Sequence, residues 1–238
     1  MNRLTLIRLS GFAGLLGALG WIVGDILIVG HIANPADYPL LTAYANQLDA
    51  ELALRLVGVP TSQLMAGALF AVFTMPLYLI GAWHLWQGIL GAGRFWSTPA
   101  ALLMFIGYAL SPLPHAAFYF LGATYQSILN TPVAAHPQLL AQAAEFRQAL
   151  NITFMPAVAC QMLGLLWFSA AVATGRSAYP RWFAVAANPL VLGLLTIGVP
   201  HLMTGTIAVW LGSAGFNTTW LLVYGFSLCL LWREKAVK

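Results

Sequence analysis

Six long apolar segments constrain the fold of this chain more than any other feature. Each has roughly the 20 residues that an α-helix needs to cross the hydrocarbon core of a bilayer. They occupy residues 9–31, 62–87, 97–125, 152–174, 180–199 and 216–232. Only 7 % of the 238 residues are charged and 61 % are hydrophobic, whereas a soluble domain carries about 25 % charged residues. The sequence therefore predicts an all-α, polytopic transmembrane bundle of six spanning helices in a single domain, 1–238.

The basic residues are explained by membrane topology. A formal net charge of +4 would suggest nucleic acid in a soluble chain, but here no nucleic-acid partner is expected, because the charges sort by loop. One side of the predicted bundle holds Arg3, Arg8, Arg94, Arg176, Arg181, Arg233, Lys235 and Lys238, and the other holds only Arg55 and Arg147. By the positive-inside rule both termini are predicted to be cytoplasmic.

Two outer loops carry amphipathic helical patterns. In the first, Leu41, Tyr44, Leu48, Leu52 and Leu56 recur at steps of three and four residues, and in the second Leu139, Ala143, Phe146 and Leu150 do the same. Such helices are expected to lie along the membrane surface or to cap the bundle. The apolar segment 201–212 is too short to span a bilayer by itself, so it is predicted to be a re-entrant or interfacial half-helix.

Two stretches of the sequence carry a family resemblance. YANQLDAELALRLVGVPTSQL, residues 44–64, contains an Arg-Leu step, and GLLWFSAAVATGRSAYPRWFAVAANP, residues 164–189, contains a basic-x-x-x-Pro-Arg turn. Together they resemble a broad bacterial family of six-helix integral membrane proteins of unknown function. The resemblance implies a helical fold in the bacterial cytoplasmic (inner) membrane, and it supplies no activity and no catalytic residues.

Ionisable groups inside spanning segments are expensive in a bilayer, so they are the first candidates for function. Asp25 is the only carboxylate within a predicted span. Segment 97–125 places a polar stripe on one helix face, made of Tyr108, Ser111, His115, Tyr119, Gly122 and Gln126. We expect Asp25, His115 and Tyr119 to be catalytic. The alternatives are structural: Asp25 would lock its helix beside a Gly20-x-x-x-Gly24 packing face, and the stripe would mend a proline kink at Pro112 and Pro114.

Further polar groups are expected at a comparable depth in the outer half of the bundle. They predict a polar cavity with ligand-binding residues His31, Ser111, Gln161, Asn188, His201, Asn217, Trp220 and Tyr224. No metal site and no cofactor are expected, because the histidines show no H-x-x-x-H or H-x-x-E-H spacing. The more common fate of a lone histidine in a membrane helix is a hydrogen bond across helices.

Three functions fit these patterns. The first is a membrane-embedded enzyme that uses acid and base groups on a lipophilic small molecule. The second is a small-molecule binding or transport protein, and the third is a structural or accessory membrane protein. The expected partners are membrane lipids and a lipophilic small molecule, and a homo-oligomer is left open.

Overall fold

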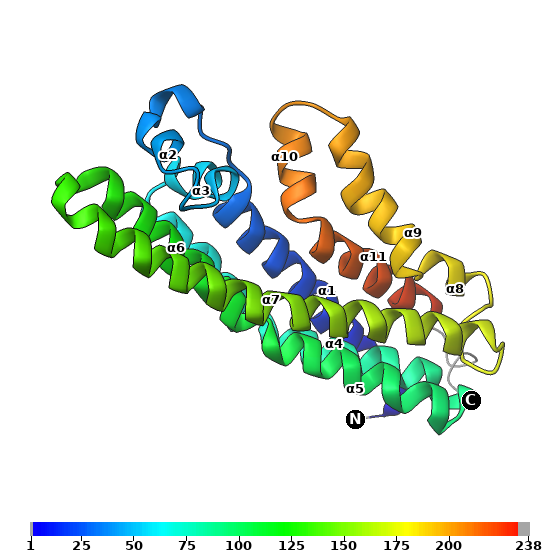
Figure 1. Ribbon diagram of the computed structural model, residues 1–238. Helices are drawn as coiled ribbons and strands as arrows, with labels where there is room; N and C mark the ends of the chain where they lie inside the picture. Colours follow the sequence, from blue (N-terminus) through cyan, green and yellow to red (C-terminus); the bar gives the residue numbers. More distant parts are fainter. Residues whose placement is uncertain (1, 233–238) are drawn as a thin grey trace.

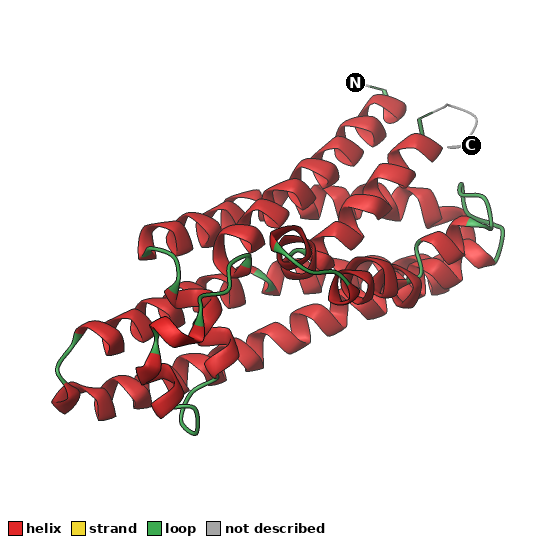
Figure 2. Cartoon of the chain, turned by 90° about the horizontal axis from the view of Figure 1, so that it is seen from above, coloured by secondary structure: helices red, strands yellow, loops and turns green. Residues whose placement is uncertain are grey.

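The computed structural model describes residues 2–232, and within that range every regular element is a helix (Figures 1 and 2). The α-helices are α1 (Arg3–Val29), α2 (Pro39–Ala43), α3 (Ala50–Val57), α4 (Thr61–Ile89), α5 (Arg94–Leu110), α6 (Pro112–Asn130), α7 (His136–Ala173), α8 (Phe183–Ala186), α9 (Pro189–Gly193), α10 (Thr206–Ser213) and α11 (Gly215–Leu230). Short 3₁₀ turns cover Pro35–Asp37, Leu90–Ala92, Val133–Ala135 and Val199–Leu202, and Leu194–Gly198 is a π-helix. The predicted positions Arg233, Lys235 and Lys238 lie outside the described residues.

Four helices of the described chain are long and apolar enough to cross a membrane. They are Arg3–Val29, Thr61–Ala92, Arg94–Asn130 and Val133–Ala173, and a fifth results if the bent pair α10–α11 is one span. The structure therefore does not confirm the predicted number of six spans. Segments 9–31 and 62–87 match α1 and α4. The helical region that contains segment 97–125 runs from Arg94 to Asn130, so it is longer than predicted. It is interrupted at Ser111, because Pro112 begins α6 and has no backbone N–H to donate.

The predicted span 180–199 is not one helix, which corrects the sequence prediction. Asn188 caps α9 by accepting a hydrogen bond from the Leu190 amide at 2.9 Å, so a new helix begins at Pro189. The apolar helix Pro189–Leu202 is too short to cross a bilayer at 1.5 Å per residue. The predicted span 216–232 corresponds to α11, which meets α10 at a 70° bend. Such a bend occurs in a broken span or a re-entrant loop, and it involves α10, which covers only residues 206–212 of the predicted half-helix 201–212.

The two amphipathic loop segments also differ from the prediction. The first is divided into α2 and α3, because the Asp49 side chain accepts from the Leu52 amide at 3.0 Å and starts a separate helix. The second is no separate surface helix, because it forms the first turns of α7, which continues through the predicted span 152–174. Residues 138–150 are mostly strong helix formers and contain neither Gly nor Pro, so nothing ends the helix before the apolar segment begins.

The bundle is held together by small residues and exposes large apolar ones. Helices α1 and α4 approach so closely that a Cβ on Gly24 would lie 2.8 Å from the Gly67 carbonyl oxygen, and a Cβ on Gly67 would lie 2.8 Å from the Gly24 oxygen. The opposite face of α1 exposes a helical stripe of apolar side chains, namely Leu9, Phe12, Leu16, Leu19 and Val23. Small residues at helix contacts and large apolar ones outside are typical of a membrane bundle.

The two ends of the described chain lie at the same end of the bundle (Figure 1). The Arg8 guanidinium donates to the Trp232 carbonyl at 2.7 Å, and Arg3 donates to Gln87 at the end of α4. Helices α2, α3 and α10 lie at the opposite end (Figure 1), which we call the distal end. Asp25 is near the distal end of α1, so the polar residues described next lie toward that end of the bundle.

Candidate functional site

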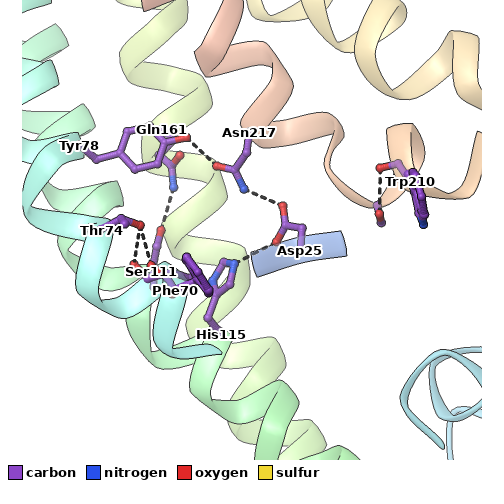
Figure 3. Close-up of polar contacts among 11 residues, drawn as sticks. Asp25, Phe70, Thr74, Tyr78, Ser111, His115, Gln161, Trp210 and Asn217 are labelled. Carbon is purple, nitrogen blue, oxygen red and sulfur yellow. Dashed lines mark hydrogen bonds and ion pairs between the residues drawn. The ribbon is translucent and has the colours of Figure 1, made fainter. Parts of the chain in front are cut away.

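Asp25 and His115 form a hydrogen-bonded pair between α1 and α6 (Figure 3). The His115 Nε2 and Asp25 Oδ1 atoms are 3.0 Å apart, and the two side chains are 9 % and 14 % exposed. The Ser111 carbonyl at the helix break positions the imidazole, because it accepts from His115 Nδ1 at 3.1 Å as well as from the His115 backbone amide at 3.5 Å. The two residues are 90 positions apart, so the pair exists only in the folded bundle.

The geometry of His115 specifies where its protons are. A carbonyl oxygen only accepts, so Nδ1 carries a proton that it donates to Ser111. The bond between Nε2 and Asp25 therefore contains one shared proton, held either by a neutral carboxyl or by the imidazole of an ion pair. Both forms of the pair have zero net charge. A proton can move across this bond without leaving a net charge in the apolar interior, where an isolated charge would be costly.

The second Asp25 oxygen continues the network into α11. The Asn217 amide Nδ2 donates to Asp25 Oδ2 at 2.7 Å, and the Tyr78 hydroxyl donates to Asn217 Oδ1 at 2.7 Å (Figure 3). The Tyr78 ring stacks on Tyr108 with centroids 4.6 Å apart, and the Tyr108 and Tyr224 hydroxyls are 3.0 Å apart. Both Asp25 oxygens therefore have protein partners, and the carboxyl is held in one orientation.

A second chain of hydrogen bonds adjoins the pair. The Trp220 indole donates to Gln161 Oε1 at 2.8 Å, Gln161 Nε2 donates to the Ser111 hydroxyl at 2.9 Å, and that hydroxyl donates to the Gly107 carbonyl at 2.7 Å. Gln161 Nε2 also lies 3.5 Å from the Gly107 carbonyl. Indole and amide N–H groups only donate and a carbonyl only accepts, so the direction of the whole chain is defined. It ties α7 and α11 to the break between α5 and α6, next to His115.

These groups line a cavity of about 200 Å³, which we call the deep cavity. Its polar wall consists of Asp25, Ser111, His115, Gln161, Ser213 and Asn217. The remaining wall is largely apolar and includes Trp21, Phe118, Phe154 and Phe216. No Lys or Arg belongs to the described wall. A few convergent polar groups in an otherwise apolar cavity are typical of small-molecule sites.

A larger cleft of about 640 Å³, which we call the vestibule, lies at the distal end. It shares five wall residues with the deep cavity, so the two spaces adjoin: Val29, Phe118, Phe154, Gly212 and Ser213. Its charged wall residues are Asp49, Glu51, Arg55 and Arg147, and His201 also belongs to the wall. A molecule that enters from the distal end would therefore pass charged groups first and the two phenylalanines next, before it reaches Asp25.

The Asp49 carboxylate organises the vestibule wall. One oxygen caps α3, and the other accepts from Arg147 of α7 at 2.6 Å. We predict that Asp49→Ala lowers the free energy of unfolding by about 1–2 kcal/mol, because it removes both the cap and the ion pair. Asp49→Asn keeps a good capping residue and should cost less than half as much. Thermal unfolding in detergent measures both changes, and equal losses in the two variants would contradict the capping role.

Four of the predicted site residues lie away from the deep cavity. Tyr119 is partly buried among apolar side chains at the distal end, His31 is exposed beside Gly58, and Asn188 caps α9. His201 is exposed in the vestibule wall, where Nδ1 bonds to the Ile197 carbonyl at 2.7 Å. The structure brings the other predicted residues together, namely Asp25, Ser111, His115, Gln161, Asn217, Trp220 and Tyr224.

Tyr119 is displaced because the stripe drifts around the helix. His115 is one turn after the break and faces α1, whereas Tyr119 is a further turn along α6, where the helix faces the distal cluster of apolar side chains. Tyr78 and Trp21 contact the network but are not among the site residues predicted from the sequence. Both are aromatic residues within apolar segments, and the sequence carries no signal that separates them from other buried aromatics.

A separate buried cluster lies at the end of the bundle that holds the chain ends. The Tyr179 and Ser227 oxygens are 2.6 Å apart, Ser227 is 2.8 Å from His84 Nε2, and His84 Nδ1 is 2.7 Å from the Ile7 carbonyl. Burial raises the pKa of the Tyr179 hydroxyl, so it stays protonated and donates to Ser227. All four groups are mutually satisfied, and the cluster joins α1, α4 and α11 to the loop after α7.

Side chains that could bind a metal ion do not cluster in the described residues. Among residues 2–232, no three His, Cys, Asp or Glu side chains come close enough together to hold a metal ion. Asp25 and His115 meet each other and no third such group, so the donor set does not resemble a zinc or non-haem iron site.

The comparisons with known proteins place the chain in one family. Residues 1–234 match the family of unknown function DUF6796, and the chain belongs to that family. No curated protein and no solved structure matches it significantly. Any account of its activity therefore depends on the geometry described above.

Proposed function

We propose that this protein is a membrane-embedded enzyme that moves a proton on a lipophilic small molecule in the deep cavity, with Asp25 and His115 as its acid–base pair. The observation that carries the proposal is the hydrogen bond between His115 Nε2 and Asp25 Oδ1, which are 3.0 Å apart in a cavity wall. A proton donor and acceptor in a water-poor site is a general requirement of acid–base catalysis. The apolar walls favour a lipophilic substrate.

The roles of the pair follow from its contacts. The Ser111 carbonyl fixes the imidazole, and Asn217 fixes the carboxyl. With both partners held, either Asp25 or His115 could deliver the shared proton to a bound molecule and recover it from water in the vestibule. Such positioned proton transfer contributes about 10²–10⁴-fold to a rate.

Deuterium incorporation would test the proposal without a known substrate. The purified protein would be incubated in D₂O with an apolar extract of its expression host, and the extract would be analysed by mass spectrometry. We expect one component to change in mass with the wild type and with Asp37→Asn, an exposed carboxylate elsewhere in the chain. The change should be absent with Asp25→Asn. No change with the wild type, or an equal change with Asp25→Asn, would contradict the enzyme.

One observation favours transport as a second candidate. Gly212 and Ser213 line both the vestibule and the deep cavity, and they lie at the 70° bend between α10 and α11. Bent or broken helices beside a cavity are common in transporters. Proteoliposomes that take up a component of the extract and release it unaltered would favour transport over catalysis.

We place the protein in the bacterial cytoplasmic membrane with both termini in the cytoplasm. The proposal rests on the basic residues at the end of the bundle that holds the chain ends, because cytoplasmic loops are rich in basic residues. These are Arg3, Arg8, Arg94, Arg176 and Arg181. A cysteine introduced at Ala36, at the distal end, should react with a membrane-impermeant maleimide in intact spheroplasts, in a background with Cys160 and Cys229 replaced by alanine. Protection of position 36 until the cells are lysed would reverse the orientation.

A further inference from the structure

The Arg55 guanidinium in the vestibule wall has few protein partners. Within residues 2–232, its one hydrogen bond runs from Nη1 to the Val29 carbonyl at 3.2 Å. Its ion-pair partner Glu51 has Oε1 at 3.6 Å from Nη2, beyond hydrogen-bonding distance, and the Glu51 side chain is 84 % exposed, so water and salt screen its charge. A guanidinium has five N–H donors. Most of those on Arg55 therefore have no acceptor among the described residues, although its side chain is only 26 % exposed.

Arg147, the other arginine of the vestibule wall, is already neutralised. Its Nη2 donates to Asp49 Oδ2 at 2.6 Å, and the second Asp49 oxygen caps α3. The two arginines and the two carboxylates of this wall cancel in formal charge, so long-range attraction does not select a ligand. The local pairing does, because Arg147 and Asp49 bind each other and Arg55 keeps donors for an incoming anion.

Arg55 lies where the vestibule meets the deep cavity. Val29, whose carbonyl holds the guanidinium, belongs to both walls, as do Phe118 and Phe154. Beyond these residues the described wall of the deep cavity has no Lys or Arg and is largely apolar. An anionic group would therefore be stabilised at Arg55 and would be costly deeper inside, whereas an apolar group is favoured deeper inside.

The sizes of the two spaces also differ in a way that suits a head and a chain. The vestibule has a volume of about 640 Å³ and the deep cavity one of about 200 Å³. The smaller volume corresponds to roughly six water molecules at about 30 Å³ each. The deep cavity therefore has room for one slender apolar group, and it is too small for the two chains of a phospholipid.

We propose that the two spaces together bind a single-chain amphiphilic anion, with its carboxylate or phosphate head at Arg55 and its apolar chain in the deep cavity. A guanidinium can donate two parallel hydrogen bonds to either kind of head. This inference rests on the proposed function and names its substrate class, because the chain would lie beside Asp25 and His115. The charged head would remain in the vestibule, toward the distal end.

Equilibrium dialysis of labelled probes tests the inference. The full-length protein would be held in nanodiscs of a zwitterionic phospholipid, and binding to empty nanodiscs would be subtracted. Octanoate and octyl phosphate are the amphiphilic anions, 1-octanol is a chain without charge, and acetate and inorganic phosphate are heads without a chain. We expect the wild type to bind at least one amphiphilic anion about tenfold more tightly than 1-octanol and than the matching head, a difference of about 1.4 kcal/mol.

Arg94 provides a matched control, because it is an exposed arginine that lines neither space. Arg55→Gln should weaken the binding of the amphiphilic anion about tenfold and leave 1-octanol unchanged, whereas Arg94→Gln removes the same charge and should alter neither. Arg55→Lys keeps the charge but not the planar fork, so its affinity should lie between those of Arg55→Gln and the wild type. Val158→Phe narrows the deep cavity and not the vestibule, so it should weaken the amphiphile and not the head alone.

The outcomes separate the two proposals. Equal effects of Arg55→Gln and Arg94→Gln, or no binding of either amphiphilic anion, would overturn the anion site and leave the acid–base proposal standing. Heads that bind as tightly without a chain, or an amphiphile that Val158→Phe does not weaken, would overturn the placement of the chain. Binding that depends on Arg55, with no deuterium incorporation in any extract component, would support the site and contradict the enzyme.

Discussion

Asp25→Asn should leave the bundle folded and reduce proton transfer by at least about 100-fold. The asparagine can donate from Nδ2 to His115 Nε2 and accept at Oδ1 from Asn217, so every hydrogen bond of the wild-type pair has a counterpart. Only the mobile proton is lost, because an amide does not exchange its proton with an imidazole as a carboxyl does. We expect the melting temperature in detergent to stay close to that of the wild type.

Asp25→Ala provides the contrast. It leaves His115 Nε2 and Asn217 Nδ2 without partners in a poorly solvated wall, at about 1–3 kcal/mol for each unsatisfied group. We therefore expect a large loss of thermal stability with alanine and almost none with asparagine. If the two variants unfold alike, the carboxylate charge itself stabilises the fold, and the structural interpretation of Asp25 as a helix lock gains support.

Gly24→Ala should disrupt the contact between α1 and α4 beside the site. Its Cβ would lie 2.8 Å from the Gly67 carbonyl oxygen, a backbone atom that cannot rotate away. Overpacking of this kind costs typically about 1–3 kcal/mol, which exceeds the gain of about 0.5–1 kcal/mol from replacing glycine within a helix. Separation of α1 from α4 would also displace Asp25, so we expect losses of both stability and activity.

Gly193→Ala is the control for this prediction. Gly193 is helical, and a Cβ there would meet no atom within 4 Å, so the substitution should be neutral or slightly stabilising. Thermal unfolding of the two variants in the same detergent gives the comparison. Wild-type stability of Gly24→Ala would show that α1 and α4 are not in the close contact described here.

The sequence was most informative where a property depends on local composition. Apolar segments of spanning length identified α1 and α4, because bilayer thickness fixes how many apolar residues a helix needs. Because ionisable residues are scarce in the apolar segments, Asp25 in α1 and His115 in α6 were the first candidates for function. Helical spacing placed Ser111 and His115 on one face of their segment, as the structure has them.

The helix boundaries, and the set of residues that form the site, depend on contacts between residues far apart in the chain, which the sequence does not specify. Segment 180–199 is as apolar as a span, yet Asn188 caps a new helix within it. Residues 138–150 were predicted to form a separate surface helix, but they are the first turns of α7. The pairing of Asp25 with His115 and Asn217 joins residues that are 90 and 192 positions apart.

By itself, the sequence determined that the chain forms apolar helices and that few polar groups lie among them, because both follow from local composition. The tertiary structure decided which of those groups meet. It brought Asp25, His115 and Asn217 together, left Tyr119, His31 and Asn188 outside, and placed Trp21 in the same wall. The physical reason is that hydrogen bonds across helices depend on packing, and here packing depends on the close contact between Gly24 and Gly67.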